Sequence, residues 1–174
     1  MDIKQLIVRN GANIEVSHQQ GVKLTDEPTL TLSAAGYNNI ISTIYVNGAP
    51  LARLHWANHY SFELLYLPAT QVLFVGAGSL SARIHLPTAR VIGQCHPFLF
   101  WGFSQVHEQQ YVLEQGEVEC MLYRTDGEII TRAPCDPPYE LDVTERGVKL
   151  TSDLFGETWL EFPTDAASRR SDEG

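Results

Sequence analysis

Residues 40–54, with the sequence IISTIYV-NG-APLARL, decide the fold class of this chain. Apolar segments flank Asn47-Gly48, and Asn-Gly readily adopts the positive φ values of the type I′ turn that joins two antiparallel strands. Asn10-Gly11 and Asp126-Gly127 stand in similar surroundings. Three such hairpin signals in 174 residues predict an all-β, antiparallel protein.

The strand pattern predicts a meander of about ten to twelve short strands that forms a sandwich or an open barrel. The segment Gly21–Thr25 is one of the expected strands, and Phe98–Phe103 is expected to be a strand buried on both faces because it lacks alternation. At most one short helix is expected, at Ser104–Gln110, where Ser104 is a suitable N-cap.

The last third of the chain alternates most clearly, in Glu117–Tyr123 and Tyr139–Thr144. Successive side chains of a strand point to opposite faces, so the apolar members of these segments are expected to be buried. The predicted core residues are Val118, Cys120, Leu122, Tyr139, Leu141, Val143, Val148 and Leu150, with Trp101 among the core aromatics.

Length and composition fit one β domain, expected to span residues 1–163 and to be followed by a flexible polar tail at 164–174. No stretch approaches the ~20 apolar residues of a membrane helix, and the first ten residues lack a small-residue cleavage site. Cys95, Cys120 and Cys135 form no CxxC pair, which favours free buried thiols in a reducing compartment. The chain is therefore expected to be cytoplasmic, without a membrane partner.

The charge is distributed unevenly. Residues 1–104 hold five acidic and six basic residues, a net charge of +1, whereas residues 105–174 hold sixteen acidic and six basic residues, a net charge of −10. This imbalance argues against nucleic acid as a partner. The uneven charge has two interpretations. Acidic residues keep the protein soluble in the first, and they form an acidic face that meets a basic protein partner in the second. The predicted partner-binding residues are Glu117, Glu119, Asp136, Glu140 and Asp142, expected on neighbouring strands as one negative patch.

One short sequence pattern occurs twice in the middle of the chain. Val72-Leu73 followed by Gly76 returns as Val112-Leu113 followed by Gly116. A period of roughly 40 residues is typical of propeller blades, although hairpins repeated in any β meander produce the same pattern. Both interpretations stay open at this point.

No catalytic residue, metal site or cofactor is predicted. The spacing of His55, His59 and Glu63 would place them on one face of a helix as metal ligands, but the surrounding pattern is that of strands. Ser79 does not stand in a GxSxG elbow. Cys95 and His96 are adjacent on an expected strand, so their side chains point apart.

The segment Tyr111–Glu119, YVLEQGEVE, resembles the cupin strand that carries the glycine and glutamate signature of that family. The resemblance implies a small β barrel that holds a metal through histidines and one glutamate. Glu108 takes the family's glutamate position only if Gln115 is an insertion. His107 stands where a histidine pair is expected, and no later histidine follows it.

Two functions follow from these observations. The first is a non-enzymatic acidic binding protein, such as a cytosolic inhibitor or a toxin-neutralising immunity protein, that docks on a basic protein. The alternative is a small-molecule or metal-binding β barrel of cupin type, either a binding protein or an enzyme.

Overall fold

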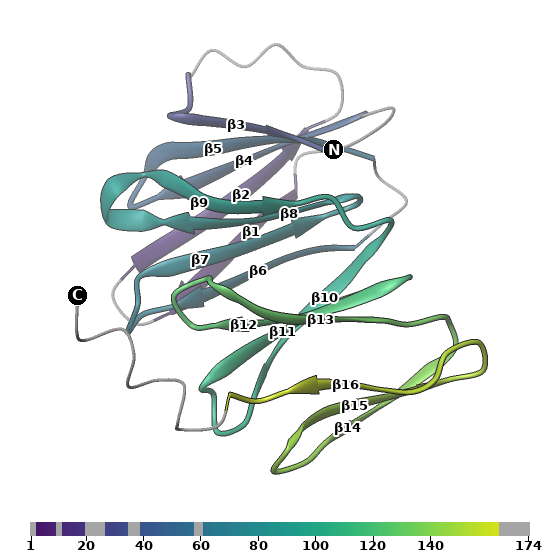
Figure 1. The fold of residues 1–174 in the computed structure, drawn as a ribbon. Helices are drawn as coiled ribbons and strands as arrows, with labels where there is room; N and C mark the ends of the chain where they lie inside the picture. The colour runs from purple at the N-terminus through teal and green to yellow at the C-terminus, as the bar shows by residue number, and fades with distance from the viewer. Residues whose placement is uncertain (1–2, 10–11, 20–26, 35–38, 58–60, 164–174) are drawn as a thin grey trace.

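Four open β-sheets, stacked on one another, make up the protein in a computed structural model (Figure 1). The structure describes residues 3–9, 12–19, 27–34, 39–57 and 61–163. These residues contain sixteen strands and one 3₁₀ turn, η1 (Leu86–Thr88). The all-β, mostly antiparallel prediction is confirmed, with more strands than the ten to twelve expected, and the described strands form no closed barrel.

Three expected features lie outside the described residues. They are the Asn10-Gly11 turn, the strand at Gly21–Thr25 and the polar tail at 164–174.

The first sheet has the strand order β1-β2-β4-β5-β3. Its strands are β1 (Ile3–Arg9), β2 (Ala12–Gln19), β3 (Leu30–Ser33), β4 (Ile40–Val46) and β5 (Ala49–Trp56). Asn47 and Gly48 form the two-residue turn between β4 and β5 with φ values of 52° and 81°, as their sequence predicts. The short strand β3 pairs with β5 in parallel, whereas the other neighbours in this sheet are antiparallel.

The three remaining sheets are antiparallel meanders, in which each strand pairs with the next one along the chain. The second sheet contains β6 (Phe62–Leu67), β7 (Val72–Ala77), β8 (Leu80–His85) and β9 (Arg90–Cys95). The third sheet contains β10 (Phe100–Val106), β11 (Tyr111–Gly116), β12 (Glu119–Arg124) and β13 (Ile129–Pro134). The fourth sheet contains β14 (Tyr139–Val143), β15 (Gly147–Ser152) and β16 (Gly156–Glu161).

A hydrophobic layer fills each of the three spaces between successive sheets. The first layer packs β4 and β5 against β7 and β8, and Ile44 and Leu73 are both fully buried in it. The second layer joins Phe74 of the second sheet to Phe100 of the third. The third layer joins Leu122 to Leu150 of the fourth sheet. The two inner sheets are therefore covered on both faces.

The second and third sheets are structural repeats. The strands β7, β8 and β9 begin at positions 72, 80 and 90, and β11, β12 and β13 begin at positions 111, 119 and 129, so position 72 corresponds to position 111. The recurring sequence pattern instead pairs Val72 with Val112, and these two do not occupy equivalent positions. They face the same layer from opposite sides, because a shift of one position along a strand reverses the face of each side chain.

The helix expected at Ser104–Gln110 is wrong. Strand β10 extends to Val106, and three successive residues with positive φ, from His107 to Gln109, then turn the chain into β11. Asp126-Gly127 also differs from the expected two-residue turn. It belongs to a longer connection in which only Gly127 of the pair has a positive φ, and the Asp126 carboxylate accepts the N–H of Glu128.

Most of the predicted core is confirmed. Cys120, Leu122, Val148 and Leu150 are buried, and Tyr139 and Leu141 are half-buried.

Three predicted core residues are exposed, namely Val118, Val143 and Trp101. Val118 lies in the two-residue turn between β11 and β12, and Val143 is the last residue of the edge strand β14. A β-bulge between Phe100 and Gly102 interrupts the alternation of β10 and leaves Trp101 outside the pairing. The expectation that Phe98–Phe103 is buried on both faces is therefore wrong, and Phe98 itself is 72% exposed.

Candidate functional site

The five predicted partner-binding acids are divided between two sheets. Glu117 lies in the turn before β12 and Glu119 begins β12, whereas Asp136 lies in the connection before β14, and Glu140 and Asp142 lie on β14. Because β12 belongs to the third sheet and β14 to the fourth, the expectation of one patch on neighbouring strands is wrong. The alternation within each segment could not show that the chain changes sheets after β13.

Two of these acids already face basic side chains of the same chain. Glu119 forms an ion pair with Arg132 on β13 at 3.5 Å. Asp142 is directly opposite Lys149 on β15, and Lys149 pairs with Glu157 at 2.9 Å. Glu117, Asp136 and Glu140 are at least partly exposed to solvent.

Alternate connections of the stacked meanders gather at one end of the stack. We call this surface the turn face, and it consists of residues 96–99, 117–118, 135–138 and 153–155. Backbone hydrogen bonds join its members, since Glu117 N–H donates to Leu99 at 2.9 Å and Cys135 N–H donates to Val118 at 3.1 Å. The turn face is therefore one continuous surface across the third sheet.

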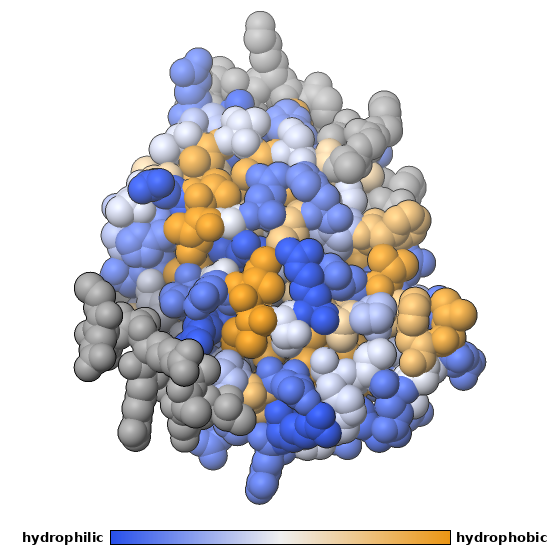
Figure 2. Space-filling view, in the orientation of Figure 1, coloured by the Kyte–Doolittle hydropathy of each residue, from blue (hydrophilic) through white to orange (hydrophobic). Residues whose placement is uncertain are grey.

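Exposed apolar side chains concentrate on and beside the turn face. Seven large apolar residues are exposed among those described, and five of them lie here: Phe98, Trp101, Val118, Leu154 and Phe155. Figure 2 shows apolar surface on the side of the molecule that carries the β15–β16 turn in Figure 1. Exposed apolar residues that gather in this way mark interaction sites more often than scattered ones do.

The charge on the turn face is of one sign. Its four connections contain Glu117, Asp136 and Asp153 and no lysine or arginine. The indole of Trp101 stacks on the ring of Tyr139 with centroids 5.2 Å apart and an interplanar angle of 5°. The Tyr139 hydroxyl in turn donates to the Gly116 carbonyl at 3.0 Å, which holds this aromatic pair against the end of the third sheet.

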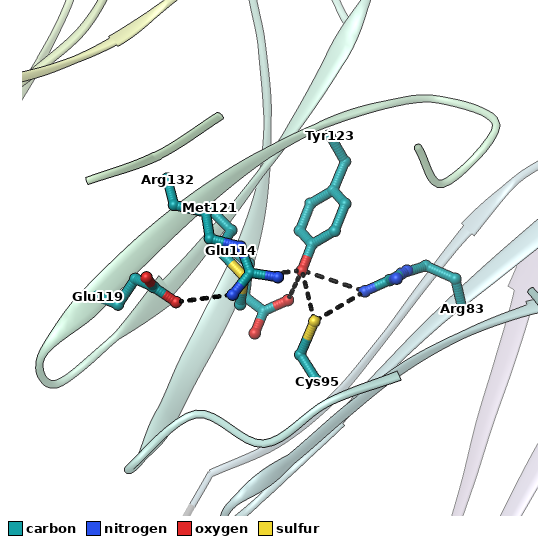
Figure 3. A network of polar contacts seen from close by, with 7 residues as sticks. All are labelled: Arg83, Cys95, Glu114, Glu119, Met121, Tyr123 and Arg132. Carbon is teal, nitrogen blue, oxygen red and sulfur yellow. Dashed lines mark hydrogen bonds and ion pairs between the residues drawn. The ribbon is translucent and has the colours of Figure 1, made fainter. Parts of the chain in front are cut away.

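A second cluster, of buried polar side chains, lies between the second and third sheets (Figure 3). The Tyr123 hydroxyl donates to Glu114 Oε2 at 2.7 Å, and Arg83 Nη1 donates to that hydroxyl at 3.3 Å. Arg83 Nη1 also lies 3.3 Å from Cys95 Sγ, and its guanidinium carbon lies 4.8 Å from the centre of the Tyr123 ring. We call Arg83, Cys95, Glu114 and Tyr123 the polar cluster.

Burial dominates the electrostatics of the polar cluster. Glu114 is 1% exposed, and this desolvation raises the pKa of its carboxyl group, against the opposite effects of Tyr123 and Arg83. Burial also raises the pKa of Tyr123, so its hydroxyl keeps its proton. Glu114 Oε1 and Arg83 Nε are buried and have no hydrogen-bond partner in the part of the chain that the structure describes. The nearby Ser81 hydroxyl affects the pKa of Glu114 without meeting ordinary hydrogen-bond geometry.

The polar cluster occupies positions that are apolar in the adjacent layers. In the structural repeat, Glu114 corresponds to Val75 and Tyr123 corresponds to Ile84, both in the first layer. The residue equivalent to Arg83 is Leu122, in the third layer. This cluster was not predicted, although a charged residue within an apolar strand such as β8 or β11 is a signal that the sequence contains. At 9% exposure or less, its side chains are closed to substrate and join the two sheets.

The residues considered as metal ligands are used differently. Glu63 Oε2 accepts the backbone N–H of Phe103 at 2.9 Å, which links β6 to β10, and His59 lies outside the described residues. Within the described ranges, no three His, Cys, Asp or Glu side chains are placed to hold a metal ion. The segment that resembles a cupin strand forms β11, the turn that follows it and the first residue of β12. The His107 ring packs on Phe162 with centroids 4.4 Å apart.

An open groove lies at the other end of the stack. It has a volume of about 390 Å³ and is lined by Thr70, Gln110, Tyr111, Arg124, Thr125 and Asp126. The Thr70 hydroxyl crosses it to donate to the Thr125 carbonyl at 2.7 Å.

No protein-family model matches the chain, and no curated protein is significantly similar to it. Among the described residues, no helix has the length and apolar character needed to cross a membrane.

Proposed function

We propose that this protein is a non-enzymatic binding protein whose turn face docks on a basic protein partner, as a cytosolic inhibitor or toxin-neutralising immunity protein would. The observation that carries the proposal is the coincidence of exposed apolar side chains with carboxylates, and no lysine or arginine, in the connections that form the turn face. Apolar and aromatic side chains supply most of the binding energy of protein interfaces. Carboxylates around them steer a basic partner and increase the association rate.

The turn face is suited to binding with little loss of conformational freedom. Its connections are short, and each is anchored on a sheet that packs against its neighbours. Pro137 and Pro138 fix φ beside Asp136, so a carboxylate is displayed on a stiff segment. Glu140 and Asp142, on the outer face of the fourth sheet, are the second acidic group that such a partner would meet.

The partner to test first is the protein encoded beside this gene, because an immunity protein and its toxin are encoded together. The complex is measured by surface-immobilised binding kinetics at low and high salt. Combined Phe98→Ala and Leu154→Ala changes are expected to raise the dissociation rate, since both side chains lie open on the turn face. Combined Glu117→Lys and Asp136→Lys changes are expected to slow association roughly three- to ten-fold at low salt.

The control is Glu145→Lys, a single charge reversal in the β14–β15 turn at the other end of the stack, compared with Glu117→Lys alone. The control variant is expected to associate as the parent does. Reversal of Glu140 and Asp142 to Lys shows whether the outer face of the fourth sheet also meets the partner. The proposal fails if no complex forms at micromolar concentration, or if the turn-face variants bind as fast and as tightly as the parent.

A further inference from the structure

Two of the three cysteines lie side by side. Cys120 on β12 and Cys135, immediately after β13, have their sulfur atoms 3.7 Å apart. Both are buried, and both are free thiols. The contact follows from strand register, because Cys120 pairs with Ala133, two residues before Cys135. The third cysteine, Cys95, belongs to the second layer and lies in a different space between sheets.

Polar groups lie beside this pair of thiols. Cys120 Sγ lies 3.5 Å from the Tyr139 hydroxyl, and Cys135 Sγ donates to the Gly116 carbonyl at 3.4 Å. The Cys135 thiol lowers the pKa of Cys120, whereas the pKa of Cys135 is raised by the same contact and by burial. Cys120 is therefore the sulfur that ionises first, and the thiolate is the reactive form.

We propose that Cys120 and Cys135 are an oxidative modification site, at which a peroxide converts the two thiols into a reversible disulfide within the chain. The sulfur atoms need to approach by roughly 1.7 Å to reach the ~2.05 Å of an S–S bond. They already touch one another, and the neighbouring hydroxyl and carbonyl oxygens lie beside them. The inference does not depend on the proposed binding function.

The reaction balances with hydrogen peroxide as the two-electron oxidant. The Cys120 thiolate attacks one peroxide oxygen, the O–O bond breaks, and a sulfenic acid forms while hydroxide leaves and is protonated to water. The Cys135 sulfur then attacks the Cys120 sulfur, so an S–S bond forms and the S–O bond breaks. The proton of Cys135 leaves with the departing hydroxide as a second water. Both sulfurs are oxidised, and a thiol reductant reverses the change.

Burial determines which oxidant reaches the site. Cys120 and Cys135 are at most 1% exposed, so the oxidant must be small and must enter through local opening of the structure. Hydrogen peroxide meets this requirement.

The test treats the full chain with excess hydrogen peroxide, alkylates the remaining thiols under denaturing conditions and measures the intact mass. We expect a loss of about 2 Da before alkylation, one remaining thiol at Cys95, and a cross-linked peptide pair that contains Cys120 and Cys135. Treatment with dithiothreitol should restore three thiols. A cross-link that involves Cys95, disulfide-linked dimers, or sulfinic acid at Cys120 without a disulfide would each overturn the proposal.

Two variants separate the pair from the third cysteine. Cys95→Ser is expected to form the same disulfide to the same extent, because Cys95 lies in another layer. Cys120→Ser is expected to lose it. The peptide map of the parent protein decides the question even where a variant folds poorly. Equal oxidation products in the parent and in Cys120→Ser would contradict the assignment.

Discussion

Removal of the Tyr123 hydroxyl tests the polar cluster most directly. Tyr123→Phe keeps the ring that packs against Phe74, with centroids 5.6 Å apart, and keeps the face that Arg83 covers. It deletes the hydroxyl that donates to Glu114 Oε2 at 2.7 Å and accepts from Arg83 Nη1 at 3.3 Å. The same hydroxyl also lies 3.3 Å from Met121 Sδ and 3.8 Å from Cys95 Sγ. The change therefore probes the buried polar contacts of this hydroxyl and leaves the packing of the ring in place.

The expected loss of unfolding free energy is about 2–3 kcal/mol, because a hydrogen bond to a charged group contributes about 1.5–3 kcal/mol and a buried group left without its partner adds a desolvation penalty. Glu114 Oε1 already has no hydrogen-bond partner among the described residues, so the variant leaves the second oxygen of the carboxyl unsatisfied as well. For a slope of about 2 kcal/mol per molar urea, the midpoint of unfolding shifts by roughly 1 M.

The loss should increase with pH. Burial raises the pKa of Glu114 above its value in the unfolded chain, so the stability that this carboxyl contributes is present below the unfolded value and is lost as pH rises through the folded one. Tyr123 lowers the pKa of Glu114, and its removal raises that pKa further. The destabilisation by Tyr123→Phe should therefore be larger at pH 7 than at pH 4.

Urea unfolding followed by tryptophan fluorescence at both pH values measures the effect. Tyr66→Phe is the matched control, because Tyr66 is also buried and its hydroxyl makes no hydrogen bond with the rest of the described chain. A double-mutant cycle with Glu114→Gln isolates the contribution of the pair. A loss below about 0.5 kcal/mol, or one that matches Tyr66→Phe at both pH values, would show that the hydroxyl does not support the layer.

Two further predictions test the layers themselves by urea unfolding. Gly93→Ala should destabilise the protein by about 1–3 kcal/mol, because the added Cβ would lie 1.8 Å from Arg83 Nη2. Unchanged stability would mean that the Arg83 side chain does not pass over Gly93. Leu150→Ala should cost about 2–5 kcal/mol as a deletion within the third layer, whereas Val143→Ala, which is 51% exposed, should change stability by less than about 0.5 kcal/mol. Similar effects of these two substitutions would contradict the placement of the fourth sheet.

The class of fold could be predicted from local signals. Asn47-Gly48 adopts the conformation that its residue types favour, and β4 and β5 pair around it in antiparallel register. The alternation around Cys120 and Leu150 identified their buried faces correctly. These features depend on residues that are neighbours in sequence or across one hairpin.

The arrangement of the sheets could not be predicted in the same way. Alternation shows that two side chains point outward from their own strands, but it does not show which sheet each strand joins. The sequence therefore predicts one patch that contains both Glu119 and Glu140, although a hydrophobic layer lies between their sheets. A pattern of constant period also does not predict the bulge beside Trp101 or the turn at His107–Gln109.

A shift of one position changes which residues of the two repeated sheets are aligned with each other. The recurrence of Val-Leu before a glycine indicated a real repetition of meanders, but it pairs position 72 with position 112, whereas the strands pair it with position 111. In the structural alignment Val75 corresponds to Glu114, so a carboxyl group stands where the preceding layer has an apolar side chain. The exception to the repeat, rather than the repeat itself, locates the polar cluster.

The outer face of the fourth sheet argues for the turn face as the principal docking surface. The last sheet of a stack needs an outer face that does not bind a further sheet, and terminal units of repeat proteins achieve this with a polar outer face. On the fourth sheet, Lys149 pairs with Glu157 and Arg146 pairs with Glu161. Carboxylates on this face thus have a role in closing the stack and are partly neutralised. The carboxylates of the turn face have no basic residue in their own connections and stand beside exposed aromatic rings, so a basic partner gains more by docking there.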